Sequence, residues 1–210
     1  MLRYIPARRL SGHPRLAETM FRDRTVQFAD RLGWPLEIGA DGGERDAYDA
    51  LEPLYVIWER PDGCHGGSMR FLPTTGRTMV EEHFSDLVQN VRIKSPYIWE
   101  CTRFCLAPDS GAGVASVLML GGLELGLRKG LSHAIGVFDA RMIRVYRRLG
   151  WPAAPLGQRG EGPEAIMAGM WDFDMSHRAT LLWRAGISGE ISDYWWRRSL
   201  GASEQLAEAV

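Results

Sequence analysis

Residues 97–104, with the sequence YIWECTRF, decide how the chain folds, because the other elements can be arranged as support for this one stretch. Its aromatic and β-branched side chains stand at the density of a buried strand. Yet it carries Glu100 and Arg103, and charges are rarely buried unless they are paired. Regular alternation puts residues three apart on opposite faces of a strand. Either the two charges face different partners, or a bulge brings them together. A structural salt bridge at a sheet edge is the simpler alternative.

The length and composition are those of one globular domain. The 210 residues can bury a sizeable core, and the 45% apolar and 24% charged content is ordinary. The net charge of -1 gives no sign of nucleic-acid binding. No apolar run is long enough to cross a bilayer, and residues 1–6 lack the apolar core of a signal peptide. We therefore predict a cytoplasmic protein with no membrane partner.

The order of the predicted elements indicates the fold class. Strands are expected at 2–6, 54–59, 66–72, 97–106, 132–138 and 165–173, and helices at 13–32, 78–90, 114–129, 139–149 and 176–185. The turn Pro61-Asp62-Gly63 should join the second and third strands into an antiparallel hairpin. This order predicts an α/β protein with a mixed sheet (α+β), built as a single layered α/β/α domain.

Two segments stand apart from these elements. Residues 36–52 show no apolar periodicity and carry six acidic residues, which indicates a long loop, and such loops are usually functional or disordered. One helical turn there would place Asp46 and Asp49 side by side. At the other end, we assign 1–186 to the main domain and 187–210 to an extension. Trp195 and Trp196 should pack back onto the body, and the last ten residues are expected to be disordered.

Several kinds of chemistry find no support in the sequence. It has no G-x-S-x-G elbow and no G-x-x-x-x-G-K-[ST] loop, and its five histidines and three cysteines lack metal or disulfide spacing, so no metal is expected. Gly111 and Gly113 open the helix at 114–129, where backbone N–H groups could cradle a phosphate. A plain glycine turn is an equally good interpretation.

The informative pattern is a set of charges that would be partly buried. It comes from the first helix, the acidic loop and two strands: Arg24, Asp46, Asp49, Arg70, Glu100 and Arg103. Three arginines and three carboxylates could cancel one another, but a buried network of this size is costly if it serves stability alone. A substrate carrying both a carboxylate and amino or sulfonium cations would make such a network useful.

At this point the sequence resembles the acyl-homoserine-lactone synthases, the autoinducer synthases of bacterial quorum sensing. The resemblance spans about residues 4–173 and rests on Arg24-x-x-x-Phe28, RLGW at 31–34, ERDAYD at 44–49, MRFLPTT at 69–75, Phe84 and WECTRF at 99–104. The family usually has serine where Thr102 stands. The resemblance implies a fold similar to that of the GCN5-type N-acetyltransferases. The Gly111–Gly113 turn lacks the preceding arginine or glutamine of the acetyltransferase motif.

The resemblance also implies a reaction between two substrates, with no tightly bound cofactor. The amine of S-adenosylmethionine attacks an acyl thioester, and the product closes to a lactone and expels methylthioadenosine. Glu100 is then the candidate general base, and backbone N–H groups near Arg103 suit the oxyanion. Phe28 and Trp34 would flank the S-adenosylmethionine pocket, since a sulfonium suits aromatic faces. The remaining residues would order the loop or touch the substrate's polar groups: Arg24, Asp46, Asp49, Arg70, Thr102 and Arg103.

The acyl group and its donor are implied less directly. An apolar slot for the acyl chain would draw on Met79, Phe84, Trp99, Met119, Leu123 and Phe138, with ordinary core packing as the alternative for each. Phe138 stands where a small hydroxyl residue often accompanies a 3-oxo chain, which argues against that group. Acyl carrier protein is favoured over acyl-CoA, because Arg144, Arg147 and Arg148 form a basic helix that could dock an acidic partner. A solvated helix face is the alternative.

Two other functions remain open at the level of sequence. One is a different GCN5-like enzyme that acylates another amine with an acyl-CoA; the other is a non-catalytic binding domain on the same fold. The acidic loop and Trp34 favour the synthase over the first, and Glu100 with its full set of charges argues against the second.

Overall fold

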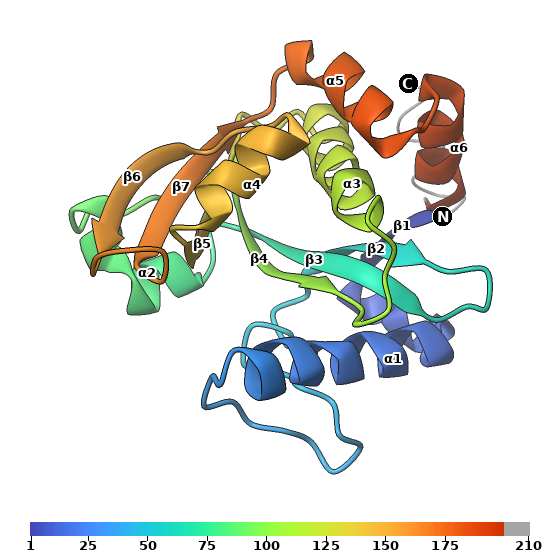
Figure 1. Cartoon of the computed structure of the whole chain (residues 1–210), viewed down its shortest axis with the longest axis horizontal. Coiled ribbons are helices and arrows are strands. Elements are labelled where there is room, and N and C mark those ends of the chain that lie inside the picture. Colours follow the sequence, from blue (N-terminus) through green and yellow to red (C-terminus); the bar gives the residue numbers. More distant parts are fainter. Residues whose placement is uncertain (200–210) are drawn as a thin grey trace.

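The computed structural model describes residues 1–199, and they form one mixed sheet with helices on both faces (Figure 1). The strands are β1 Leu2–Pro6, β2 Leu54–Glu59, β3 His65–Pro73, β4 Ile98–Leu106, β5 His133–Asp139, β6 Ala154–Arg159 and β7 Ile166–Asp172. The helices are α1 Pro14–Arg24, α2 Met79–His83, α3 Val114–Arg128, α4 Met142–Leu149, α5 Ser176–Ala185 and α6 Gly189–Ser199. A π-helical segment, Thr25–Arg31, continues α1, and 3₁₀ turns occupy Ala7–Gly12 and Ser85–Val88.

The sheet has the order β1-β2-β3-β4-β5-β7-β6. All neighbours are antiparallel except β4 and β5, which run parallel and pair only from Ile98–His133 to Glu100–Ile135. Beyond Glu100 the two strands have no further paired residues. The predicted hairpin of β2 and β3 and the predicted mixed sheet are both confirmed.

Two layers of helices cover the sheet. On one face, α3 is buried over much of its circumference and packs on β1, β2 and β3 within the main core. On the other face, α1 packs on β3 and β4, and α2 with the 85–88 turn covers β5, β6 and β7 (Figure 1). The α/β/α layering expected from the sequence is therefore confirmed.

The structure corrects the sequence prediction in three elements. The helix expected over 13–32 is α-helical only to Arg24 and then widens into the π-helical turn. Strand β6 was not predicted; it lies at the sheet edge, where Pro155, which has no N–H, is tolerated. Helix α6 was also missed. The expected packing of Trp195 and Trp196 onto the body is confirmed, since both lie in the main core. The disorder expected for the last ten residues falls outside the described residues, and the division at residue 186 stays a prediction.

Within residues 1–199, no helix is long and apolar enough to cross a membrane.

Candidate active site

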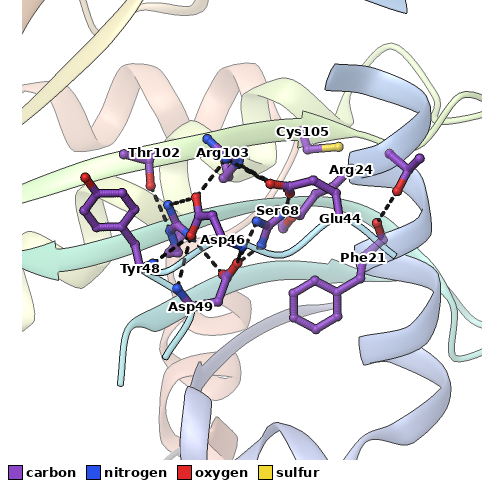
Figure 2. Close-up of polar contacts among 12 residues, drawn as sticks. Phe21, Arg24, Glu44, Asp46, Tyr48, Asp49, Ser68, Thr102, Arg103 and Cys105 are labelled. Atoms are coloured by element: carbon purple, nitrogen blue, oxygen red, sulfur yellow. Dashed lines mark hydrogen bonds and ion pairs between the residues drawn. The ribbon is translucent and has the colours of Figure 1, made fainter. Parts of the chain in front are cut away.

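The site is a buried ionic network that ties one loop to three elements of the fold (Figure 2). Its cations are Arg24 of α1, Arg70 of β3 and Arg103 of β4, and its anions are Glu44, Asp46 and Asp49 of the 36–52 loop. The two signs cancel. The loop that the sequence indicated has no strand or helix of its own beyond an isolated bridge between Ile38 and Glu44, so contacts with other elements, this network among them, fix its course.

Arg24 and Arg70 hold the loop through bidentate pairs. Arg24 Nε donates to Glu44 Oε2 at 2.6 Å, while its Nη1 and Nη2 donate to the Asp49 carboxylate, each at 2.9 Å. Arg70 Nη1 and Nη2 donate to Asp46 at 2.5 and 2.9 Å. Both arginine side chains are only 1% exposed. Paired fork contacts of this kind add geometric specificity to their energy.

Arg103 reaches the network because β4 bulges at that point. Two residues of β4, Arg103 and Phe104, oppose the single residue Met69 of β3, and Arg103 has a left-handed φ of 53°. A bulge re-aims a side chain, and Arg103 Nη2 thereby lies 2.9 Å from Glu44 and 2.8 Å from Asp46. The bulge anticipated from the sequence is present.

Glu44 is the network member that the sequence analysis missed. Its side chain is fully buried and accepts from both Arg24 and Arg103. The sequence pattern gives it no role beyond its place in the acidic loop and in the ERDAYD motif. The available signal is its position, since Glu44 stands in the same motif as Asp46 and Asp49.

Electrostatics favour the ionised form of Asp49. Burial opposes the ionisation of Asp49, but the hydrogen bond and charge of Arg24, together with the charge of Arg70, outweigh it and hold the pKa of Asp49 well below its usual range. Asp46 and Asp49 share one turn, as expected, and Asp46 N donates to Asp49 Oδ2 at 2.9 Å.

Glu100 lies outside this network, contrary to the expectation that it joins the arginines. Its Oε1 and Oε2 accept from Val80 N at 2.7 Å and Met79 N at 3.0 Å, in the first turn of α2. The N-terminus of a helix offers such unpaired N–H groups. The side chain is buried, and burial raises the pKa of the carboxyl although the two backbone donors and Arg70 oppose it. Glu100 and Arg103 thus face different partners, and the bulge does not bring them together.

Two aromatic rings border the network on the side of the π-helical turn. Phe28, which is buried, stacks on Trp34 with ring centroids 5.1 Å apart, and the Arg103 guanidinium lies 5.4 Å from the Phe28 centroid. Trp34 is 38% exposed. Thr102, the remaining residue of the predicted substrate site, accepts from Arg70 Nε at 3.0 Å.

A cavity of about 60 Å³ opens where β4 and β5 diverge. Residues 101–104 of β4 and 136–138 of β5 line it, with Met119 of α3 and Tyr146 of α4. Trp151 and Trp171, which the sequence analysis did not propose, close it. We call it the β4–β5 cavity. Because Arg103 belongs to both, the cavity and the ionic network meet at the bulge.

The structure separates the six residues proposed for the acyl slot. Met119 and Phe138 line the β4–β5 cavity. Met79 instead places its Sδ against Arg70 and Arg103, at 3.9 and 3.7 Å, and Phe84 packs beside Val80 and Leu87 on the other face of the sheet. Trp99 and Leu123 belong to the main core but do not line the cavity.

The residues proposed for docking lie on the surface. Gly111 and Gly113 are exposed before α3, and a Cβ added at either would meet nothing within 4 Å. A side chain would therefore fit at either position, and no close approach within the protein requires glycine at this turn. Arg144, Arg147 and Arg148 are exposed on α4, the helix whose buried Tyr146 lines the cavity. Among residues 1–199, no group of three or more metal-ligating side chains could hold a metal ion.

Comparisons with known proteins identify the family. The family model for autoinducer synthases matches residues 9–181. An acyl-homoserine-lactone synthase of Rhizobium etli is 40% identical over 197 residues, which cover 90% of this chain and 91% of that protein. One from Rhizobium radiobacter is 34% identical over 152 residues, which cover 66% of this chain and 69% of that protein. The chain therefore belongs to the autoinducer synthase family and is an acyltransferase of the acyl-homoserine-lactone synthase class.

Solved structures agree with this assignment. MesI, a CoA-dependent acyl-homoserine lactone synthase, has a TM-score of 0.80 and 25% identity over 91% of this chain and 98% of its own. BjaI, another CoA-dependent synthase, was solved with SAM and isopentyl-CoA; its TM-score is 0.79, with 25% identity over 90% of each chain. An N-acetyltransferase from Lactobacillus plantarum, at 13% identity and a TM-score of 0.55, shows the fold alone. The predicted likeness to the N-acetyltransferase fold is confirmed.

Proposed function

We propose that this synthase acylates the α-amine of S-adenosylmethionine with an acyl thioester and then closes the product to an N-acyl-homoserine lactone, with release of methylthioadenosine. One observation carries the proposal: a polar network and an apolar cavity meet at the bulge of β4, with a buried carboxylate, Glu100, three residues before it. Such a junction suits a charged amino acid on one side and an acyl chain on the other. The BjaI complex with SAM and isopentyl-CoA supports the same pair of substrates.

Acyl transfer needs a base, and Glu100 is our assignment. The attacking amine must lose a proton, either directly to the carboxylate or through one water. Burial raises the pKa of Glu100, and a base whose pKa approaches the working pH transfers protons more effectively. The new bond joins nitrogen to the carbonyl carbon, and the carbon–sulfur bond breaks so that the thiol leaves. Backbone N–H groups at Arg103 and Phe104, where the bulge interrupts the ladder, would receive the oxyanion.

Lactone closure is a matter of positioning. The substrate carboxylate attacks the carbon bonded to the sulfonium, and the sulfur leaves as a neutral thioether, so no further acid or base is needed. The ionic network would hold the loop over the substrate, with Phe28 and Trp34 beside the sulfonium. A closure of this kind gains most from fixing the two reacting groups close together.

The basic side chains of helix α4 favour acyl carrier protein as the acyl donor. Its exposed Arg144, Arg147 and Arg148 face away from the cavity that Tyr146 lines, so an acidic carrier protein could dock while its acyl arm reaches inward. MesI and BjaI are CoA-dependent, which makes acyl-CoA the alternative donor. For that donor, the open turn at Gly111 and Gly113 would approach the phosphates. All of these substrates belong to the cytoplasm, where we place the enzyme.

The proposal is tested by supplying purified protein with S-adenosylmethionine and a panel of acyl-CoA and acyl carrier protein thioesters. We expect methylthioadenosine and one N-acyl-homoserine lactone in equal amounts, measured by mass spectrometry. Methylthioadenosine at the level of the enzyme-free control with every donor, from protein shown to be folded, would refute the proposal.

A further inference from the structure

The β4–β5 cavity ends against a wall of aromatic rings. Phe138, Tyr146 and Trp171 contact one another with centroids 5.0 to 5.5 Å apart, and Trp151 lies 6.4 Å from Trp171. All four are at least nine-tenths buried. Rings packed edge to face or tilted against one another, as here, hold one another in place.

Hydrogen bonds and close packing make this wall rigid. Trp151 Nε1 donates to Asp172 O at 2.9 Å, and Trp171 Nε1 donates to Trp151 O at 3.2 Å. Gly169 makes room for Phe138, since a Cβ at that glycine would lie 2.9 Å from the ring. Moving the wall would break two buried hydrogen bonds, so the cavity is not readily lengthened.

The space in front of the wall is small. The cavity measures about 60 Å³. An apolar cavity of about 150 Å³ binds benzene, so a cavity of less than half that volume takes only a short hydrocarbon group. Its lining is mainly aromatic and aliphatic, which suits hydrocarbon rather than a strongly polar chain.

We infer that this synthase takes short acyl groups, and that the wall formed by Phe138, Tyr146, Trp151 and Trp171 limits their length. The inference rests on the proposed function, because it assigns the cavity to the acyl chain. The inference adds the length of the acyl chain, which the sequence left undetermined.

The test compares butanoyl, hexanoyl, octanoyl, decanoyl and dodecanoyl donors as CoA and as carrier-protein thioesters. A chain that outgrows an apolar pocket loses about tenfold or more in kcat/KM, so butanoyl or hexanoyl should exceed decanoyl by at least that factor. Phe138→Ala should move the optimum to octanoyl or longer. Leu123→Ala is the matched control, a buried truncation in the same core that does not line the cavity, and it should keep the wild-type preference.

Wild-type preference for decanoyl or dodecanoyl would overturn the inference while leaving the proposed function in place. So would an equal shift in Phe138→Ala and Leu123→Ala, because the effect would then come from general loosening of the core. If Phe138→Ala does not fold, Met119→Ala widens the cavity from α3 and must shift the preference in the same direction. Absence of methylthioadenosine with every donor would remove the proposed function itself and this inference with it.

Discussion

Arg24 and Glu44 are joined by a 2.6 Å hydrogen bond between two side chains that are almost completely buried and twenty residues apart in the chain. The same carboxylate accepts from Arg103 on β4. Glu44 therefore fastens the acidic loop to α1 and to the sheet at once.

Glu44→Gln should loosen the loop and weaken the site. The change removes one of the two carboxylates that hold each of Arg24 and Arg103, and breaking a buried ion pair from one side costs about 3–5 kcal/mol. We expect a comparable loss in the free energy of unfolding, measured by urea titration, and a higher KM for S-adenosylmethionine. Asp41→Asn is the control in the same loop, because its pair with Arg45 is half exposed, and it should change neither quantity. Equal effects of both changes would contradict the role of Glu44.

The network should also set the acid stability. Because the pKa of Asp49 is depressed in the folded state, its contribution is complete above the unfolded carboxyl pKa, near 4, and is lost as the pH falls toward the lower folded pKa. The free energy of unfolding should therefore fall steeply below about pH 4. In Asp49→Asn that slope should be shallower, although the variant is less stable at neutral pH. Parallel curves for the two proteins would show that Asp49 titrates normally.

Reversing the charge of Arg144, Arg147 and Arg148 tests the donor. If α4 docks an acidic carrier protein, KM for acyl carrier protein should rise while turnover of an acyl-pantetheine donor stays the same. The difference should shrink with added salt, since exposed charges are screened over roughly 8–10 Å at physiological ionic strength. An unchanged KM for the carrier protein, with efficient use of acyl-CoA, would assign the donor to CoA.

The sequence predicts an element correctly where its own residue types show both its secondary structure and its burial. The side chains of residues 97–104 predict the strand, whereas its two charges left separate partners and a bulge as alternatives, and the structure has both. Strand β6 was missed because its residues lack strand-like density and it pairs on one side only. Helix α6 was missed because its order comes largely from packing Trp195 and Trp196 against the core, a contact between distant parts of the chain.

Most residues of the site could be predicted from the sequence, but the partner of each side chain could not. Arg24, Asp46, Asp49, Arg70 and Arg103 do meet, but charge counting alone cannot say which carboxylate faces which arginine. A sequence pattern pairs side chains with side chains and so predicts that Glu100 joins the arginines, whereas the backbone of α2 supplies its hydrogen bonds. Trp151 and Trp171 reach the cavity from outside every quoted motif, so no local signal identifies them.

The most direct test of the account is the pH dependence of kcat for Glu100→Gln. Because burial raises the pKa of Glu100, its contribution to stability is full below the unfolded carboxyl pKa and is lost as the pH rises through the folded pKa. The neutral amide avoids that loss, so at pH 8 the variant should be no more than about 1 kcal/mol less stable than the wild type, the worth of one backbone hydrogen bond.

Loss of the base should lower kcat by on the order of 10²–10⁴ and abolish the acidic limb of the wild-type profile. The measurement is methylthioadenosine release across the pH range, with the folded fraction determined in parallel. A folded Glu100→Gln enzyme that keeps the wild-type kcat and the same acidic limb would contradict the account and leave Glu100 as a structural partner of α2.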